Sequence, residues 1–159
     1  MNKGAVLIWA PERLVQACQL TLSLSLGLCA LAASASETSF SGTWSIDLRS
    51  AEQKRQNVEC GHALFVLLQK GSSISGTHSM SAPGCARLNE DGPVLGSASG
   101  GSATLVVTSG RNGAVVEGVA ELKGANKLRW RTTRELKVGE PDGDSPLILS
   151  EGVLVRGAR

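Results

Sequence analysis

Residues 40–48 of the chain read FSGTWSIDL, and apolar or small residues alternate with polar ones along the whole stretch. Phe40, Trp44 and Leu48 fall on one side of this two-residue period, and serine, threonine and aspartate fall on the other. Successive side chains of a strand point to opposite faces of its sheet. The stretch therefore predicts a β-strand with one buried face and one face in water.

Seven further runs of strand length follow, and glycine separates most of them. The expected strands are 40–48, 62–69, 73–80, 93–99, 103–109, 114–122, 127–133 and 147–155. Residues 50–57 read as one short helix, with Ser50 and Gln53 placed as a capping box. No run is long enough for a crossover helix between parallel strands. We therefore expect an all-β fold, an eight-stranded antiparallel up-and-down (meander) barrel.

Turn chemistry predicts how neighbouring strands pair. Asn112 followed by Gly113 favours a type I′ hairpin, and a hairpin centred there places Leu105 opposite Ala120.

Two more loops have predictable lengths. A two-residue turn at 71–72 places Phe65 opposite His78. A three-residue loop at 124–126 keeps Trp130 on the core face, whereas a loop shorter by one residue would turn every side chain of its strand to the other face.

The first 35 residues have the features of an export signal. Residues 20–33 are apolar, follow a weakly basic leader, and end at an A-x-A motif. This predicts a signal peptide at 1–35 cleaved before Ser36, with a single β-barrel domain at 36–159. A membrane anchor and lipid attachment at Cys29 are the alternatives. The apolar run offers roughly 14 residues where a spanning helix needs about 20, which favours cleavage.

Cysteine usage agrees with export. Signal removal leaves Cys60 and Cys85 as the two cysteines of the mature chain, which predicts one disulfide in a periplasmic or secreted protein. It would close a loop of about 25 residues and contribute roughly 3 to 3.5 kcal/mol. The formal charge of +2 indicates neither nucleic acid nor an anionic membrane as a partner.

Residues 41–44 (SGTW), in the first strand of an eight-strand meander, resemble the G-x-W signature of calycin barrels such as lipocalins and avidin. The resemblance implies a small ligand-holding barrel with a basic residue of a late strand over Trp44, for which Arg131 and Arg134 are candidates. Trp130 is the other tryptophan after the signal and tyrosine is absent, so a biotin-type aromatic cage is not expected. The chain also resembles, more loosely, one-disulfide periplasmic barrels that inhibit secreted proteases or lysozymes.

Metal binding and catalysis find little support. Cys60, His62, His78, Met80 and Cys85 form a soft-ligand set on paper, but the predicted register places the two histidines on opposite faces of one sheet. No catalytic motif is present, and a Ser79, His78 and Asp47 trio is expected by chance in a serine-rich chain. We therefore expect no metal, no cofactor and no enzymatic activity.

Two charged segments also have simple interpretations. The acidic segment at 140–144 could hold calcium, but it has fewer oxygen ligands than a calcium-binding loop, so we interpret it as an ordinary acidic turn. The basic run of Lys127, Arg129, Arg131 and Arg134 alternates with Leu128, Trp130 and Thr132, which predicts an outward basic stripe. It is either a patch for an acidic partner or, as we favour, a solvated face, partly balanced by Glu121 opposite Arg129.

Two functions remain. The first is an exported non-enzymatic binding protein that holds a small apolar ligand inside the barrel, an interior that could equally be a packed core. The second is a loop-mediated module that binds another exported protein, such as an inhibitor of an exported hydrolase, through residues 79–93. In either case we expect a monomer. The expected ligand lining is Trp44, Phe65, His78, Ala120 and Trp130.

Overall fold

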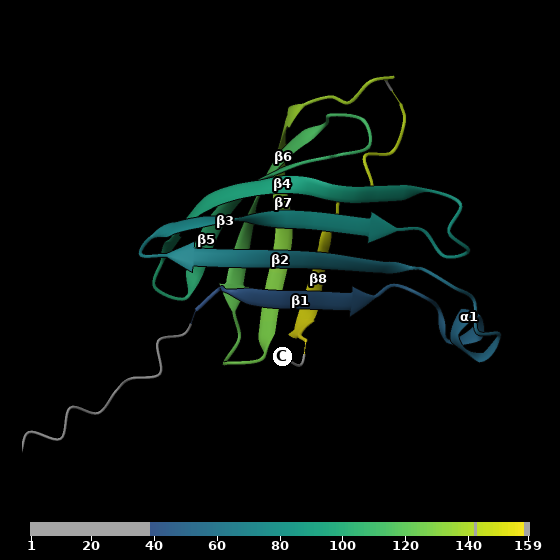
Figure 1. The fold of residues 1–159 in the computed structure, drawn as a ribbon, viewed down its shortest axis with the longest axis horizontal. Coiled ribbons are helices and arrows are strands. Elements are labelled where there is room, and N and C mark those ends of the chain that lie inside the picture. The colour runs from purple at the N-terminus through teal and green to yellow at the C-terminus, as the bar shows by residue number, and fades with distance from the viewer. Residues whose placement is uncertain (1–38, 142, 158–159) are drawn as a thin grey trace, which may run out of the picture. The chain divides into compact units, whose positions relative to one another are not determined.

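The computed structural model of this protein describes residues 39–141 and 143–157. Each of its strands pairs with the next, and the last pairs with the first through Trp44 opposite Arg156 and Ser45 opposite Val155, which closes a barrel (Figure 1). The elements are β1 (Gly42–Asp47), α1 (Ala51–Arg55), β2 (His62–Lys70), β3 (Ser73–Ser81), β4 (Leu88–Ser99), β5 (Ser102–Thr108), β6 (Val115–Leu122), β7 (Lys127–Lys137) and β8 (Glu151–Arg156).

This arrangement confirms the predicted all-β class, the closed eight-stranded meander and the short helix after the first strand. The helix begins as predicted: the Ser50 hydroxyl accepts the Gln53 backbone N–H, and the Gln53 side chain accepts the Ser50 backbone N–H. The predicted signal peptide and Cys29 lie outside the described residues.

Three strand boundaries differ from expectation by four residues or more. β7 ends at Lys137 rather than at residue 133. β4 begins at Leu88 rather than at residue 93, because a register shift between His78 and Met80 lets β3 continue pairing with the earlier part of β4. β8 begins at Glu151 rather than at residue 147. The backbone just before β8 is held by side chains instead of a strand partner: the Leu147 carbonyl accepts from Asn89.

The turn at 71–72 and the loop at 124–126 have the predicted registers. Phe65 lies opposite His78, and Ala120 lies opposite Trp130. His62 is exposed while His78 is fully buried, so the two histidines do point to opposite faces of the barrel wall.

The predicted type I′ hairpin at Asn112 is wrong. Gly113 has a positive φ of 72° but Asn112 does not, and four residues separate Ser109 from Ala114, whose backbone groups close the turn at 2.7 Å. Leu105 therefore lies opposite Gly118 instead of Ala120. The Ser109 hydroxyl accepts backbone N–H groups inside the turn, which stabilises this longer form. The error is two residues, so every side chain keeps its predicted face.

The barrel interior is a core of aromatic and aliphatic side chains. Trp44, Phe65 and Trp130 are at most 1% exposed. Small residues do not leave empty space at Gly118, where a Cβ atom would lie 2.4 Å from Cη2 of Trp130. The indole ring of Trp130 thus occupies the volume that a larger residue on β6 would need, in agreement with a densely packed interior.

Candidate functional site

The five residues expected to line a ligand site lie together inside the barrel, and all are fully buried or nearly so. The ring centroids of Phe65 and His78 are 4.5 Å apart, and those of Phe65 and Trp130 are 5.3 Å apart. Trp44 lies opposite Phe65, and Ala120 lies opposite Trp130. The structure therefore brings the five together, as one packed cluster.

A basic residue does cover Trp44, but it is Arg156 rather than Arg131 or Arg134. Its guanidinium carbon lies 4.0 Å from the ring centroid. The same guanidinium donates to the backbone carbonyls of Ser39 and Ser41. The prediction overlooked barrel closure: once β8 pairs with β1, a residue of the last strand is the direct neighbour of Trp44.

The two predicted candidates lie elsewhere on the surface. Arg131 is exposed, and Arg134 forms an ion pair with Glu117. Arg129 does lie opposite Glu121, as expected, but the Glu121 carboxylate contacts Lys123 at 2.7 Å. The Lys123 ammonium and, to a smaller extent, the charges of Arg129 and Arg131 lower the pKa of Glu121. The basic stripe is therefore a solvated face with local partners.

His78 is the one buried titratable side chain of this core among the described residues. Its Nε2 accepts the backbone N–H of Leu149 at 3.4 Å, which assigns the ring proton to Nδ1. That Nδ1 is buried and has no hydrogen-bond partner. Burial lowers the pKa of His78 from 6.5 to about 4, so the ring is neutral at neutral pH.

The disulfide of Cys60 and Cys85 is formed, as predicted. It ties the connection before β2 to the short loop between β3 and β4. That loop spans only residues 82–87, because β4 begins at Leu88, inside the segment 79–93 that was proposed as a disulfide-tethered binding loop. The backbone N–H of Gly84 also donates to the Glu59 carbonyl, so the loop is pinned on two sides. No cluster of metal-ligating side chains occurs in residues 39–141 and 143–157.

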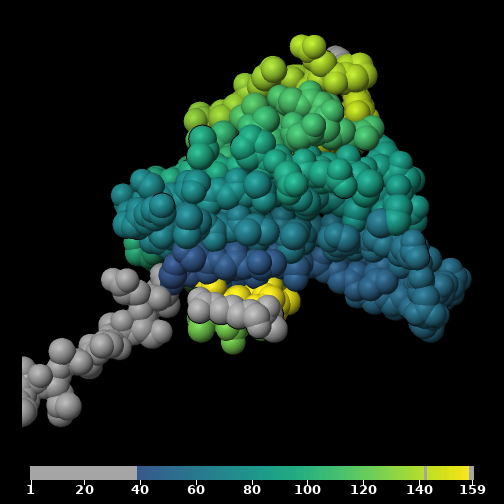
Figure 2. All heavy atoms as spheres, viewed as in Figure 1, coloured from purple at the N-terminus to yellow at the C-terminus, as the bar shows by residue number. Residues whose placement is uncertain are grey.

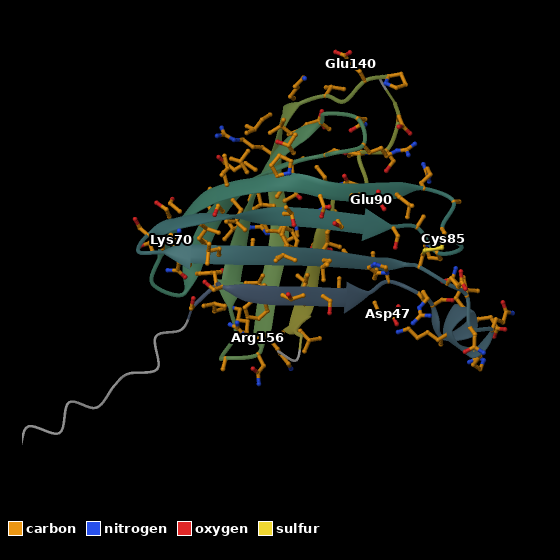
Figure 3. All side chains as sticks on the ribbon, viewed as in Figure 1. Asp47, Lys70, Cys85, Glu90, Glu140 and Arg156 are labelled. Atoms are coloured by element: carbon orange, nitrogen blue, oxygen red, sulfur yellow. A yellow bond between two sulfur atoms is a disulfide. The ribbon has the colours of Figure 1, made fainter. Side chains whose placement is uncertain are left out.

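Sequence reasoning missed a marked asymmetry of charge on the outer surface. The five strands β1–β5 carry four Asp, Glu, Lys or Arg residues, whereas the three strands β6–β8 carry ten. The four are Asp47, Lys70, Glu90 and Asp91. Asp47 and Lys70 are each the last residue of their strand, and because β1 and β2 are antiparallel the two residues lie on opposite sides of the view in Figure 3. Counting charges strand by strand would have revealed this asymmetry.

The central outer positions of β2–β5 form what we call the uncharged face. Figure 2 shows β1–β4 from this side, as one continuous blue-to-teal surface. Val66 is 43% exposed, Leu68 50% and Leu95 63%. The members of the uncharged face are Leu64, Val66, Leu68, Ser75, Thr77, Ser79, Pro93, Leu95, Ser97, Thr104 and Val106.

The side chains of the uncharged face differ in length from strand to strand. The strand register places Ser75 between Leu68 and Leu95, and Leu95 in turn lies opposite Val106. Ser75 of β3, with a short hydroxyl side chain, thus lies between the longer aliphatic side chains of Leu68 and Leu95. One end of the face meets an open hollow of about 380 Å³ beside the disulfide, lined in part by His62 and Leu88.

Comparison with known proteins gives no match: no family model fits the chain, and neither a curated protein nor a solved structure is significantly similar. The likeness to calycins therefore consists of the closed eight-stranded barrel and the G-x-W strand. In the part of the chain that the structure describes, no helix has the length and hydropathy of a membrane span.

Proposed function

We propose that this chain is an exported, non-enzymatic binding protein with a calycin-like barrel, and that it docks onto another exported protein through the uncharged face. The disulfide is compatible with an oxidising compartment outside the cytosol. A filled interior leaves the outside of the barrel as the larger recognition surface.

The charge asymmetry carries this proposal. Leu68 and Leu95 are at least half exposed, and no charged residue of β3–β5 lies directly opposite either of them in the strand register, although the same chain places ten charged residues on β6–β8. Interface centres are depleted of charge, whereas ordinary solvated surface is not. The uncharged face therefore fits a partner with a flat apolar and hydroxyl-rich surface of its own.

Site-specific crosslinking tests the proposal. A photo-crosslinking amino acid at position 95, introduced into the protein in its own exported fraction, should give one dominant protein adduct. The same amino acid at Val153 is the matched control, since Val153 is a 47% exposed valine on the charged side, opposite Arg129. Equal adducts from both positions would contradict docking through the uncharged face.

A charge substitution provides the functional test. Leu95→Lys should abolish the complex that native mass spectrometry detects, because docking would bury an unpaired ammonium group. Val153→Lys should leave the complex intact. A complex that survives Leu95→Lys would overturn the proposal.

One observation favours a second candidate, a small apolar ligand inside the barrel. The Nδ1–H of His78 is a buried donor without a partner, and buried polar groups are nearly always hydrogen-bonded. A bound molecule with an acceptor atom would satisfy it. Native mass spectrometry of the protein purified from its own compartment tests this candidate, which requires a small co-purified mass.

A further inference from the structure

A segment outside the regular strands closes one end of the barrel. We call residues 143–150, which lead into β8, the strap. Leu147 and Leu149 of the strap are buried, and Leu149 joins the core cluster. Figure 1 shows this part of the chain in yellow-green beside the β6 end of the barrel.

Side chains of the barrel interior bind both the backbone N–H and the carbonyl of Leu149. Its backbone N–H donates to Nε2 of His78 at 3.4 Å. Its carbonyl accepts from Nε1 of Trp130 at 2.6 Å and from the hydroxyl of Thr132 at 3.2 Å. Its side chain lies 3.6 Å from the position of a Cβ atom on Gly152, inside the wall of β8. A donor, an acceptor and an isobutyl group of one residue are thus all recognised by interior groups.

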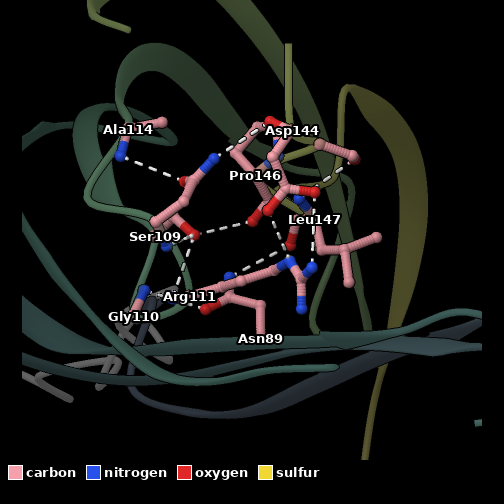
Figure 4. A network of polar contacts seen from close by, with 10 residues as sticks. Asn89, Ser109, Gly110, Arg111, Ala114, Asp144, Pro146 and Leu147 are labelled. Carbon is pink, nitrogen blue, oxygen red and sulfur yellow. Dashed lines mark hydrogen bonds and ion pairs between the residues drawn. The ribbon is translucent and has the colours of Figure 1, made fainter. Parts of the chain in front are cut away.

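Polar side chains from the start of β4 and from the turn between β5 and β6 hold the strap (Figure 4). We call Asn89, Ser109, Arg111 and Asn112 the clasp. Asn89 donates to the Leu147 carbonyl, Ser109 to the Pro146 carbonyl and Asn112 to the Asp144 carbonyl, at 2.7 to 3.0 Å. Arg111 forms an ion pair with the Asp144 carboxylate.

The strap carries a local conformational cost. Leu147 has a φ of 48°, in the left-handed region that branched side chains rarely adopt. The clasp keeps the strap in this conformation, and the interior keeps Leu149. The clasp therefore holds the strap, while different residues in the interior contact Leu149. A substitution in the clasp can weaken the first set of contacts without changing the second.

We infer that the place of Leu149 is a binding site, which the strap fills with the chain's own residue until an external ligand replaces it. The inference rests on the interior binding given above as the second candidate function. The ligand class follows from what Leu149 presents: a small N-acylated aliphatic amino acid amide, with an amide N–H on one side of a branched carbon and an amide carbonyl on the other. Its N–H takes the place of the Leu149 N–H at His78, and its carbonyl takes the place of the Leu149 carbonyl at Trp130.

Competition with the strap sets the expected affinities. An external ligand binds only the fraction of molecules whose strap is displaced, so its apparent dissociation constant is the intrinsic constant divided by that fraction. Weakening the clasp raises the fraction and must tighten apparent binding by the same factor. A strap that served packing alone would give no such gain.

The test uses Asn112→Ala and Arg111→Ala, two clasp variants that leave every interior residue in place. The probe is N-acetyl-leucine N-methylamide, and its control is the ester analogue in which oxygen replaces the leucine N–H. Binding is followed by the indole N–H resonance of Trp130 in nuclear magnetic resonance titrations, with Trp44 as the internal reference. Hydrogen exchange of the Leu149 N–H reports how far each variant loosens the strap.

We expect faster exchange at Leu149 in both variants, and an apparent affinity for the amide at least tenfold above that of wild type. The ester should bind at least tenfold more weakly than the amide. Faster exchange without titration of Trp130 would overturn the inference, as would unchanged exchange in both variants. Equal titration by amide and ester would remove the amide as the ligand class while interior binding itself stands.

Discussion

Acid should destabilise this protein through His78, and the magnitude follows from its burial. The ring is neutral in the folded barrel, where its pKa is lowered to about 4, and it titrates near 6.5 in the unfolded chain. As the pH falls below 6.5, the unfolded state binds a proton that the folded state refuses. The stabilising contribution is therefore complete above pH 6.5 and is lost progressively down to about pH 4. At about 1.4 kcal/mol per pKa unit, the loss amounts to about 3 kcal/mol.

The immediate surroundings of His78 contain few other ionisable groups. His78 packs against the ring of Phe65, lies opposite Gly92 on β4 and accepts from Leu149 of the strap. The charged groups nearest in sequence on β4, Glu90 and Asp91, are exposed. Hydrogen bonds from Arg49 hold the pKa of Asp47 far below this range. The measurement compares variants, so contributions that the variants share cancel.

Urea unfolding at closely spaced pH values, followed by tryptophan fluorescence, measures the effect. His78→Gln keeps an acceptor for the Leu149 N–H but cannot titrate, so its free energy of unfolding should lose about 3 kcal/mol less than wild type between pH 7 and pH 4. His62→Gln, which changes the exposed histidine, should follow the wild-type curve. Parallel curves for wild type and His78→Gln would refute the reasoning.

Three further substitutions probe the core and its covalent link. Trp44→Ala should cost roughly 3 to 5 kcal/mol in the same assay, because it leaves a cavity where the ring is fully buried; a melting temperature within a few degrees of wild type would contradict this. Ala120→Leu adds bulk against Trp130 and should cost roughly 1 to 3 kcal/mol in a packed core; retained stability, together with loss of apolar-probe uptake, would instead indicate a cavity. Replacing both Cys60 and Cys85 by alanine should cost roughly 3 to 3.5 kcal/mol, and an intact mass showing two free thiols in the exported wild type would contradict the disulfide.

The first strand illustrates how much the sequence already determined. The alternation around Trp44 predicted which side chains face the core, and the capping box of Ser50 predicted the start of α1. The turn at 71–72 predicted the pairing of Phe65 with His78. These features depend on residues close together in the chain, whose periodicity and turn chemistry act before any tertiary contact forms. The pairing of Cys60 with Cys85 was predicted from the number of cysteines left after the expected removal of a signal, and not from a local pattern.

Contacts between distant residues decided the rest. Arg156 covers Trp44 because barrel closure places the last strand beside the first, and no local pattern marks that neighbour. The turn after β5 is longer than predicted because the Ser109 hydroxyl bonds within the turn while also donating to the Pro146 carbonyl. The strap depends on side chains from β4 and from the turn after β5, both far from it in sequence. Local periodicity sets the direction of each side chain, but only the tertiary structure brings together distant groups such as Arg156 with Trp44 and Asn89 with Leu147.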